Sequence, residues 1–296
     1  MLDPQDRELF NRFRHRTLFS LGDSGIVEIY ENYLLQVCFT CPFLMHGTLA
    51  VTAAHDRYLG VAPTHRRSLQ ESYHLSQRTT LFNRWLCQPI KEEHKDPLWA
   101  TAGALAILTC SSINAGCTAE AWPLRASNSS ELEWVRLGAG KMTLWNLVNP
   151  LRPESIFRVM TENFAYLHYA LPRKGIGGVS AKLAQLCGLD ESSTQETNPY
   201  FSVAHALSRL LEAPNGAASQ GAVILVSSHM HNEFGTLLEK KDPVALLLLS
   251  LWYTRARQSK WWMDIRARYE LPAICTYLRR YHRDNGIIQA LIPGAE

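Results

Sequence analysis

The sequence predicts an all-α protein, and three features of the chain support this. Side-chain caps followed by a proline suited to the first helical turn recur, at Asp96-Pro97, Leu151-Arg-Pro-Glu154 and Asp242-Pro243. Between these signals apolar residues recur three and four positions apart, as on one face of a helix. Strand patterns are rare, and the clearest one, Ala222-Val-Ile-Leu-Val226, has no obvious partner strand. We therefore interpret it as a buried helix.

The elements follow in order along the chain. Residues 41–60 are typical of a buried helix, and two later helices each carry one apolar face. These faces are formed by Leu69, Tyr73, Thr80, Leu81 and Trp85 in the first helix, and by Trp262, Ile265 and Tyr269 in the second. Pro272 should kink or interrupt the second helix, because proline has no N–H to donate. Stretches rich in Gly, Ser and Asn predict loops at residues 111–130, 174–180, 187–199 and 213–221.

The chain is long enough for a large hydrophobic core. It has 296 residues, of which 46% are hydrophobic and 19% charged, as in an ordinary globular protein. No repeat and no long linker divides it. We predict one helical domain over residues 1–296, with about ten helices that enclose an apolar pocket.

The net charge and the lack of targeting signals indicate which partners and which cellular compartment to expect. A formal net charge of +3 is too small to indicate nucleic-acid binding. The N-terminus lacks the apolar segment of a signal peptide, and the longest nearly apolar run, residues 243–253, is too short to span a bilayer. We expect an intracellular soluble protein, cytoplasmic or nuclear, without a membrane span.

The cysteines and paired histidines predict no metal site. The seven cysteines are scattered and odd in number, which suits a reducing compartment. Cys38-x-x-Cys41 is the only close pair, and no second pair of ligands follows it. His229-Met-His231 lacks an identifiable third ligand and is better interpreted as a polar loop. We expect neither a metal nor a cofactor.

His46 and His55 are unusual on a segment of Ala, Leu and Val, because a buried imidazole needs a hydrogen-bond partner. Nine residues at about 100° each place them on opposite sides of their helix, so they cannot bind one metal. Each is either a core histidine with a partner or a residue that contacts a ligand. The tryptophans leave the same choice open, since indoles on helices form cores and also line apolar cavities.

The order of these segments resembles a known family. "PFLMHGTLAVTAAHDRYL", from Pro42, is similar to a stretch in the C-terminal regulatory domain of fungal zinc-cluster transcription factors, in the sterol uptake control protein subgroup. Residues 242–278 resemble the same subgroup's leucine-rich segment and the Trp-Trp helix that follows it. Trp134-Val-Arg-Leu-Gly138 lies about where the subgroup has a central helix that leads into a glycine. The resemblance covers roughly residues 7–285.

This resemblance implies an all-helical domain with an apolar pocket for a sterol-like molecule, often in a dimer. The family's six-cysteine DNA-binding module does not match any part of the chain, so we expect no direct DNA binding. Pro272 within the Trp-Trp helix also departs from the pattern, and Gly47 is less favourable for a helix than the residue expected there.

Three functions follow from these observations. The first is a finger-less, regulator-like protein that binds a sterol, terpenoid or polyketide, as a homodimer or paired with a full-length regulator. The second is a cofactor-independent cyclase or isomerase of fungal secondary metabolism, with His46 or His55 as the catalytic acid or base. The third is an interaction partner without a ligand. The predicted ligand-binding residues are Met45, His46, His55, Trp85, Trp252 and Trp262.

Overall fold

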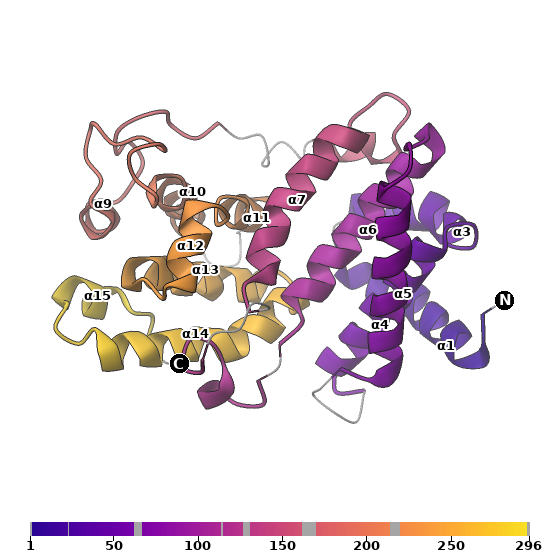
Figure 1. Ribbon diagram of the computed structural model, residues 1–296, viewed down its shortest axis with the longest axis horizontal. Helices are drawn as coiled ribbons and strands as arrows, with labels where there is room; N and C mark the ends of the chain where they lie inside the picture. The colour runs from indigo at the N-terminus through magenta and orange to yellow at the C-terminus, as the bar shows by residue number, and fades with distance from the viewer. Residues whose placement is uncertain are drawn as a thin grey trace. The chain divides into compact units, whose positions relative to one another are not determined.

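The predicted all-α class is confirmed. The computed structural model describes residues 2–22, 24–61, 67–113, 115–126, 131–161, 170–213 and 220–294. This part of the chain is 70% helical, has no strand and forms 14 α-helices (Figure 1). The predicted number of about ten was wrong, because several helices are too short to show a periodic apolar pattern: α3 (Leu35–Val37) has three residues, and α2 (Ser24–Ile29) and α15 (Gly286–Leu291) have six each.

The chain divides into two compact units. Unit 1 comprises Met1–Ser112 and Gly140–Glu162, and unit 2 comprises Ile113–Ala139 and Asn163–Glu296. Helix α7 (Glu133–Val148) contributes residues to both units. The single domain over 1–296 stays a prediction.

Unit 1 is built around one helix that is buried on almost every side. Helix α4 (Pro42–Tyr58) packs against α1 (Pro4–Arg12), α5 (Leu69–Leu86) and α6 (Glu92–Cys110), and Figure 1 shows α4, α5 and α6 side by side. Its many Ala, Gly and Thr residues let neighbouring backbones approach closely. The remaining segments of unit 1 are α2, α3, the short π-helices η1 (Phe13–Thr17) and η3 (Tyr30–Leu34), and the short 3₁₀ helices η2 (Leu18–Ser20) and η5 (Ile156–Met160).

Unit 2 also has a helix that is buried nearly all round. Helix α13 (Pro243–Ser259) carries the leucine-rich run and packs most extensively against α14 (Trp261–Tyr281). The other segments are η4 (Thr118–Glu120), α9 (Ala181–Cys187), α10 (Phe201–Glu212), α11 (Gln220–Ser228), α12 (Glu233–Glu239) and α15. Helix α11 contains residues 222–226, which confirms the helical interpretation of that run.

One of the three predicted proline caps is confirmed and two were wrong. The Asp242 carboxylate accepts a hydrogen bond from the Ala245 N–H, so it caps α13 as predicted. Helix α6 begins at Glu92, which places Pro97 inside it. Residues 151–154 form turns, and the helical turn that follows begins at Ile156 with Ser155 as its cap.

Pro272 does not end its helix either. Helix α14 is assigned without a break from Trp261 to Tyr281. A proline removes one backbone hydrogen bond, but packing of Leu271, Ala273 and Ile274, all buried, offsets that loss. The same argument holds for Pro97, whose neighbours are also buried.

The predicted loops at 174–180 and 187–199 are confirmed, apart from Cys187, which ends α9. Those at 111–130 and 213–221 fall partly outside the described residues. No helix in the described ranges is both long enough and apolar enough to cross a membrane.

Candidate functional site

Three polar side chains from three helices of unit 1 meet beside α4. Nδ1 of His46 on α4 lies 2.9 Å from Nδ1 of His74 on α5. Nε2 of His74 lies 3.0 Å from Oδ1 of Asp6, in the first turn of α1. We call Asp6, His74 and His46 the relay. His74 is 1% exposed, whereas His46 is half-buried.

Local structure fixes both ends of the relay. Asp3 caps α1 by accepting a hydrogen bond from the Asp6 N–H, which fixes the turn that carries the Asp6 carboxylate. The side-chain amide of Gln70 donates to the same carboxylate at 3.4 Å. The His74 ring does not point its Nε2–H directly at Asp6, so this contact is electrostatic rather than a well-aligned hydrogen bond.

The pKa values of both imidazoles of the relay are lowered, which favours the neutral forms at pH 7. Burial lowers the pKa of His46, and the neighbouring His74 lowers it further. Burial also lowers the pKa of His74, although the negative charge of Asp6 opposes this. A neutral imidazole carries one N–H and one acceptor nitrogen, so the relay has a definite proton arrangement.

The charge of Asp6 sets that arrangement. A carboxylate favours a proton on the nearest nitrogen, which is Nε2 of His74. Nδ1 of His74 then accepts a hydrogen bond from the Nδ1–H of His46. Nε2 of His46 is left unprotonated, and it has no partner among the described residues. The relay therefore ends in a half-buried nitrogen lone pair.

The Tyr73 ring lies beside His46, and other apolar residues are near it in the sequence. The Tyr73 ring meets the His46 ring edge-on at 5.9 Å and is 55% exposed. Leu69, one turn earlier on α5, is 91% exposed. Met45, the neighbour of His46 on α4, is buried. A basic nitrogen beside exposed apolar groups can accept a hydrogen bond from the hydroxyl of a hydrophobic molecule.

His55 has a different neighbour, as the spacing predicts. Its Nδ1 lies 3.0 Å from the Thr17 hydroxyl, and its ring stacks on Tyr58 at 6.3 Å. It is 5% exposed, and burial, with the nearby Arg16 second, lowers its pKa to about 4. These contacts are those of a core histidine.

The predicted ligand-binding tryptophans lie in different surroundings. Trp85, in unit 1, contacts the rings of Phe43 at 5.7 Å and His94 at 4.1 Å. Trp252 and Trp262 both belong to unit 2. The indole N–H of Trp252 donates to the Val223 carbonyl at 2.9 Å.

The six predicted residues therefore divide between the units: Met45, His46, His55 and Trp85 belong to unit 1, and Trp252 and Trp262 to unit 2. Two clefts of about 710 and 510 Å³ in the described part of the chain both lie in unit 2. Neither is lined by any of the six. A pocket enclosed by helices stays a prediction.

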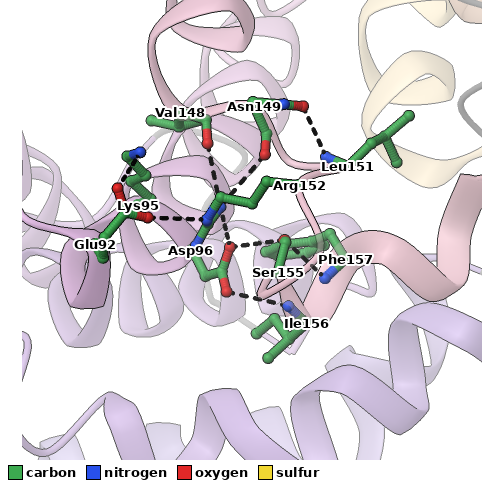
Figure 2. Close-up of polar contacts among 10 residues, drawn as sticks. All are labelled: Glu92, Lys95, Asp96, Val148, Asn149, Leu151, Arg152, Ser155, Ile156 and Phe157. Atoms are coloured by element: carbon green, nitrogen blue, oxygen red, sulfur yellow. Dashed lines mark hydrogen bonds and ion pairs between the residues drawn. The ribbon is translucent and has the colours of Figure 1, made fainter.

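A second polar cluster in unit 1 joins α6 to the end of α7 (Figure 2). Nη1 of Arg152 lies 2.9 Å from Oδ1 of Asp96 and donates to the Val148 carbonyl at 3.1 Å. The same carboxylate accepts hydrogen bonds from the Ser155 hydroxyl and the Ile156 N–H, at 2.8 and 3.1 Å. Asp96, predicted to cap its own helix, thus instead accepts the first N–H of η5, beside the Ser155 cap. We call this cluster the Arg152 clamp, and its contacts are structural.

No grouping of three His, Cys, Asp or Glu side chains suited to a metal occurs in the ranges that the structure describes. His229 and His231 lie in the turn between α11 and α12, and burial lowers the pKa of His229 to about 4.

Comparison of the chain with protein families and with characterised proteins finds no match in either. The resemblance to fungal regulators therefore remains a prediction from the quoted segments.

Sequence reasoning found one member of the relay and missed two. His46 stood out because it interrupts an apolar segment. His74 lies among polar residues, and Asp6 is 40 positions before His46, so neither gives a local signal. Only the packing of α1 and α5 on α4 brings them together.

Proposed function

We propose that this chain is a helical binding protein for a hydrophobic small molecule, a sterol, terpenoid or polyketide, with His46 as its polar anchor. The observation that supports this is the unpaired Nε2 of His46. The His46 ring is oriented by the hydrogen bond between its Nδ1 and Nδ1 of His74, and the Tyr73 ring lies beside it. The resemblance to sterol-responsive regulators supports the same ligand class. In that role the chain acts as a homodimer or paired with a full-length regulator.

The relay explains how one hydrogen bond selects a ligand with a hydroxyl group. Nε2 of His46 accepts the hydroxyl proton, and the apolar remainder of the ligand covers the exposed rings nearby. Loss of a buried hydrogen bond costs about 1–3 kcal/mol, and burial of the ligand's apolar surface supplies the rest of the affinity.

Titration with a fluorescent sterol, dehydroergosterol, tests the proposal through energy transfer from the tryptophans. His46→Ala should weaken binding about 5- to 150-fold, which corresponds to about 1–3 kcal/mol. His55→Ala is the matched control on the same helix, and it should lower stability without changing the affinity of the folded protein. Equal affinities for all three proteins would exclude His46 as the anchor.

A second function, a cofactor-independent cyclase or isomerase, is favoured by one specific observation. The carboxylate–imidazole–imidazole order of the relay can make His46 a general base. Its Nε2 would take a proton from one atom of a bound substrate and return it to another, so that the reaction needs no oxidant or reductant. Turnover by His46→Ala would then fall by roughly 10²–10⁴-fold with binding little changed. Loss of stability alone in both histidine variants would favour an interaction partner without a ligand.

A further inference from the structure

Arg78 on α5 is a buried cation that has no counterion among the described residues. Its side chain is 1% exposed, and its Nε and Nη1 have no hydrogen-bond partner in the described structure. Only Nη2 is engaged, with the Thr79 hydroxyl at 3.2 Å. Nε carries one N–H and Nη1 carries two, so three strong donors lack acceptors. Buried donors without acceptors are rare in folded proteins and call for an explanation.

The buried carboxylate on the same helix is already occupied. Glu71 is 2% exposed and accepts two hydrogen bonds from Arg57, at 3.0 and 3.1 Å. Arg67 adds a third contact to Glu71 at 3.6 Å. Burial lowers the pKa of Arg78 to about 10, with Arg67 as the second cause, so Arg78 stays charged at pH 7. This part of unit 1 therefore has an excess of positive charge.

The backbone of α4 is shaped to admit this arginine. A Cβ on Gly47 would lie 3.3 Å from Cδ of Arg78 and 3.6 Å from the Cβ of Ala104 on α6. The absence of a side chain at Gly47 thus makes room for the Arg78 side chain between α4, α5 and α6. A long cation could reach solvent from a helix surface, but this one is directed into the interior.

We infer that Arg78 binds an oxyanion, a carboxylate or a phosphate group, at the place where α4, α5 and α6 meet. An oxyanion supplies both the negative charge and the several acceptor oxygens that the three free N–H groups require. A single water has two lone pairs and no charge, so it cannot meet both needs. This site is separate from the sterol-type site at His46, and it stands whether or not His46 binds a ligand.

Thermal unfolding in a buffer free of oxyanions tests the inference, with inorganic phosphate, acetate and octanoate as probes. Wild-type protein should show a saturable rise in its unfolding midpoint, roughly 3–6 °C at a hundredfold excess over Kd. Arg78→Met should lose that rise and should be at least as stable as wild type before any probe is added. Arg84→Met, an exposed arginine on the same helix, is the matched control and should respond like wild type.

The three probes distinguish the sources of the oxyanion. A response to octanoate at far lower concentration than to acetate indicates the carboxylate of an amphipathic molecule. Equal responses to the two indicate a free small carboxylate, and a response to phosphate alone indicates a phosphate group. Equal shifts in wild type and Arg78→Met, or no shift in wild type with any probe, would overturn the inference.

If Arg78→Met does not fold, NMR of the wild-type protein labelled with ¹⁵N-arginine tests the same inference. A buried Nε–H exchanges slowly and gives its own resonance. That resonance should move saturably with the probe that raises the midpoint, and a spectrum unchanged by all three probes rules the site out.

Discussion

Nδ1 of His46 lies 2.9 Å from Nδ1 of His74, so one of these nitrogens carries a proton and the other accepts it. The charge of Asp6 selects His46 as the donor, which leaves Nε2 of His46 as a free acceptor. ¹⁵N NMR of the histidine rings should find the proton on Nδ1 of His46 and on Nε2 of His74. Asp6→Ala should mix the two tautomers of each ring, and Glu8→Ala, an exposed acid on the same helix, should not. A proton on Nε2 of wild-type His46 contradicts the arrangement.

Acid should destabilise the protein through His55. Its folded pKa of about 4 lies below the ordinary value of 6.5, so the unfolded chain binds a proton in the window between them that the folded chain does not. The stability that this shift contributes is therefore present above pH 6.5 and lost as pH falls toward 4. Between about pH 7 and about pH 5 the loss is roughly 2 kcal/mol.

Urea unfolding at these two pH values measures the loss. His55→Asn keeps an acceptor for the Thr17 hydroxyl but cannot titrate. The free energy of unfolding of this variant should therefore fall between the two pH values by roughly 2 kcal/mol less than that of wild type. The exposed His15→Asn should behave like wild type. The same pH dependence in His55→Asn and wild type would assign the acid sensitivity to other groups, among which His46, His74 and His229 shift in the same direction.

The Arg152 clamp should contribute measurably to folding because both partners are largely buried, at 8% and 9% exposure. A double-mutant cycle with Arg152→Met and Asp96→Asn should give a coupling of about 1–3 kcal/mol that changes little with salt. The Arg136–Glu239 pair is the control, since both side chains are about half exposed. Its coupling should stay below about 1 kcal/mol. Equal couplings for the two pairs would show that burial adds nothing to the clamp.

Whether a structural feature could be predicted from the sequence depends on how far apart in the chain its interacting residues lie. The recurring apolar spacing was enough for the helical class, and the composition of residues 41–60 for the burial of α4, because those signals are local. The spacing misplaced the buried face of α5, where Leu69 and Tyr73 are exposed while Glu71, His74 and Arg78 are buried. The role of Asp96 could not be inferred from its own neighbours, since its partners lie about 60 residues later. The same holds for Asp6 in the relay. Gly47 was visible as an anomaly, but its reason, the Arg78 side chain, belongs to the next helix.

Purified protein should contain no stoichiometric zinc. Zinc binds cysteine as thiolate, and burial raises the pKa of Cys38 to about 12 and also raises that of Cys41. The Cys38 sulfur instead lies 3.6 Å from the Thr48 hydroxyl. Elemental analysis should give far less than one zinc per chain. About one zinc per chain, lost in Cys38→Ser, would contradict this.

The isolated protein should not discriminate between DNA sequences. Its formal net charge is only +3, which is too small for strong attraction to the phosphate backbone. Fluorescence anisotropy at near-physiological salt should give the same weak binding for any duplex. A salt-resistant complex with one sequence over scrambled duplexes would refute the expectation.

Each unit contains its own pair of touching indoles. In unit 2, Trp134 and Trp252 are nearly parallel, with ring centres 5.4 Å apart, and in unit 1 Trp99 and Trp145 meet edge-on at 5.2 Å. The electronic transitions of two rings this close couple, and the coupling depends on their mutual angle. Unit 2 also holds the edge-on pair Trp261–Trp262 at 5.6 Å. Replacing Trp99 and Trp145 with phenylalanine should therefore remove the coupled-indole signal of unit 1 and leave a near-ultraviolet circular dichroism signal from the coupled indoles of unit 2.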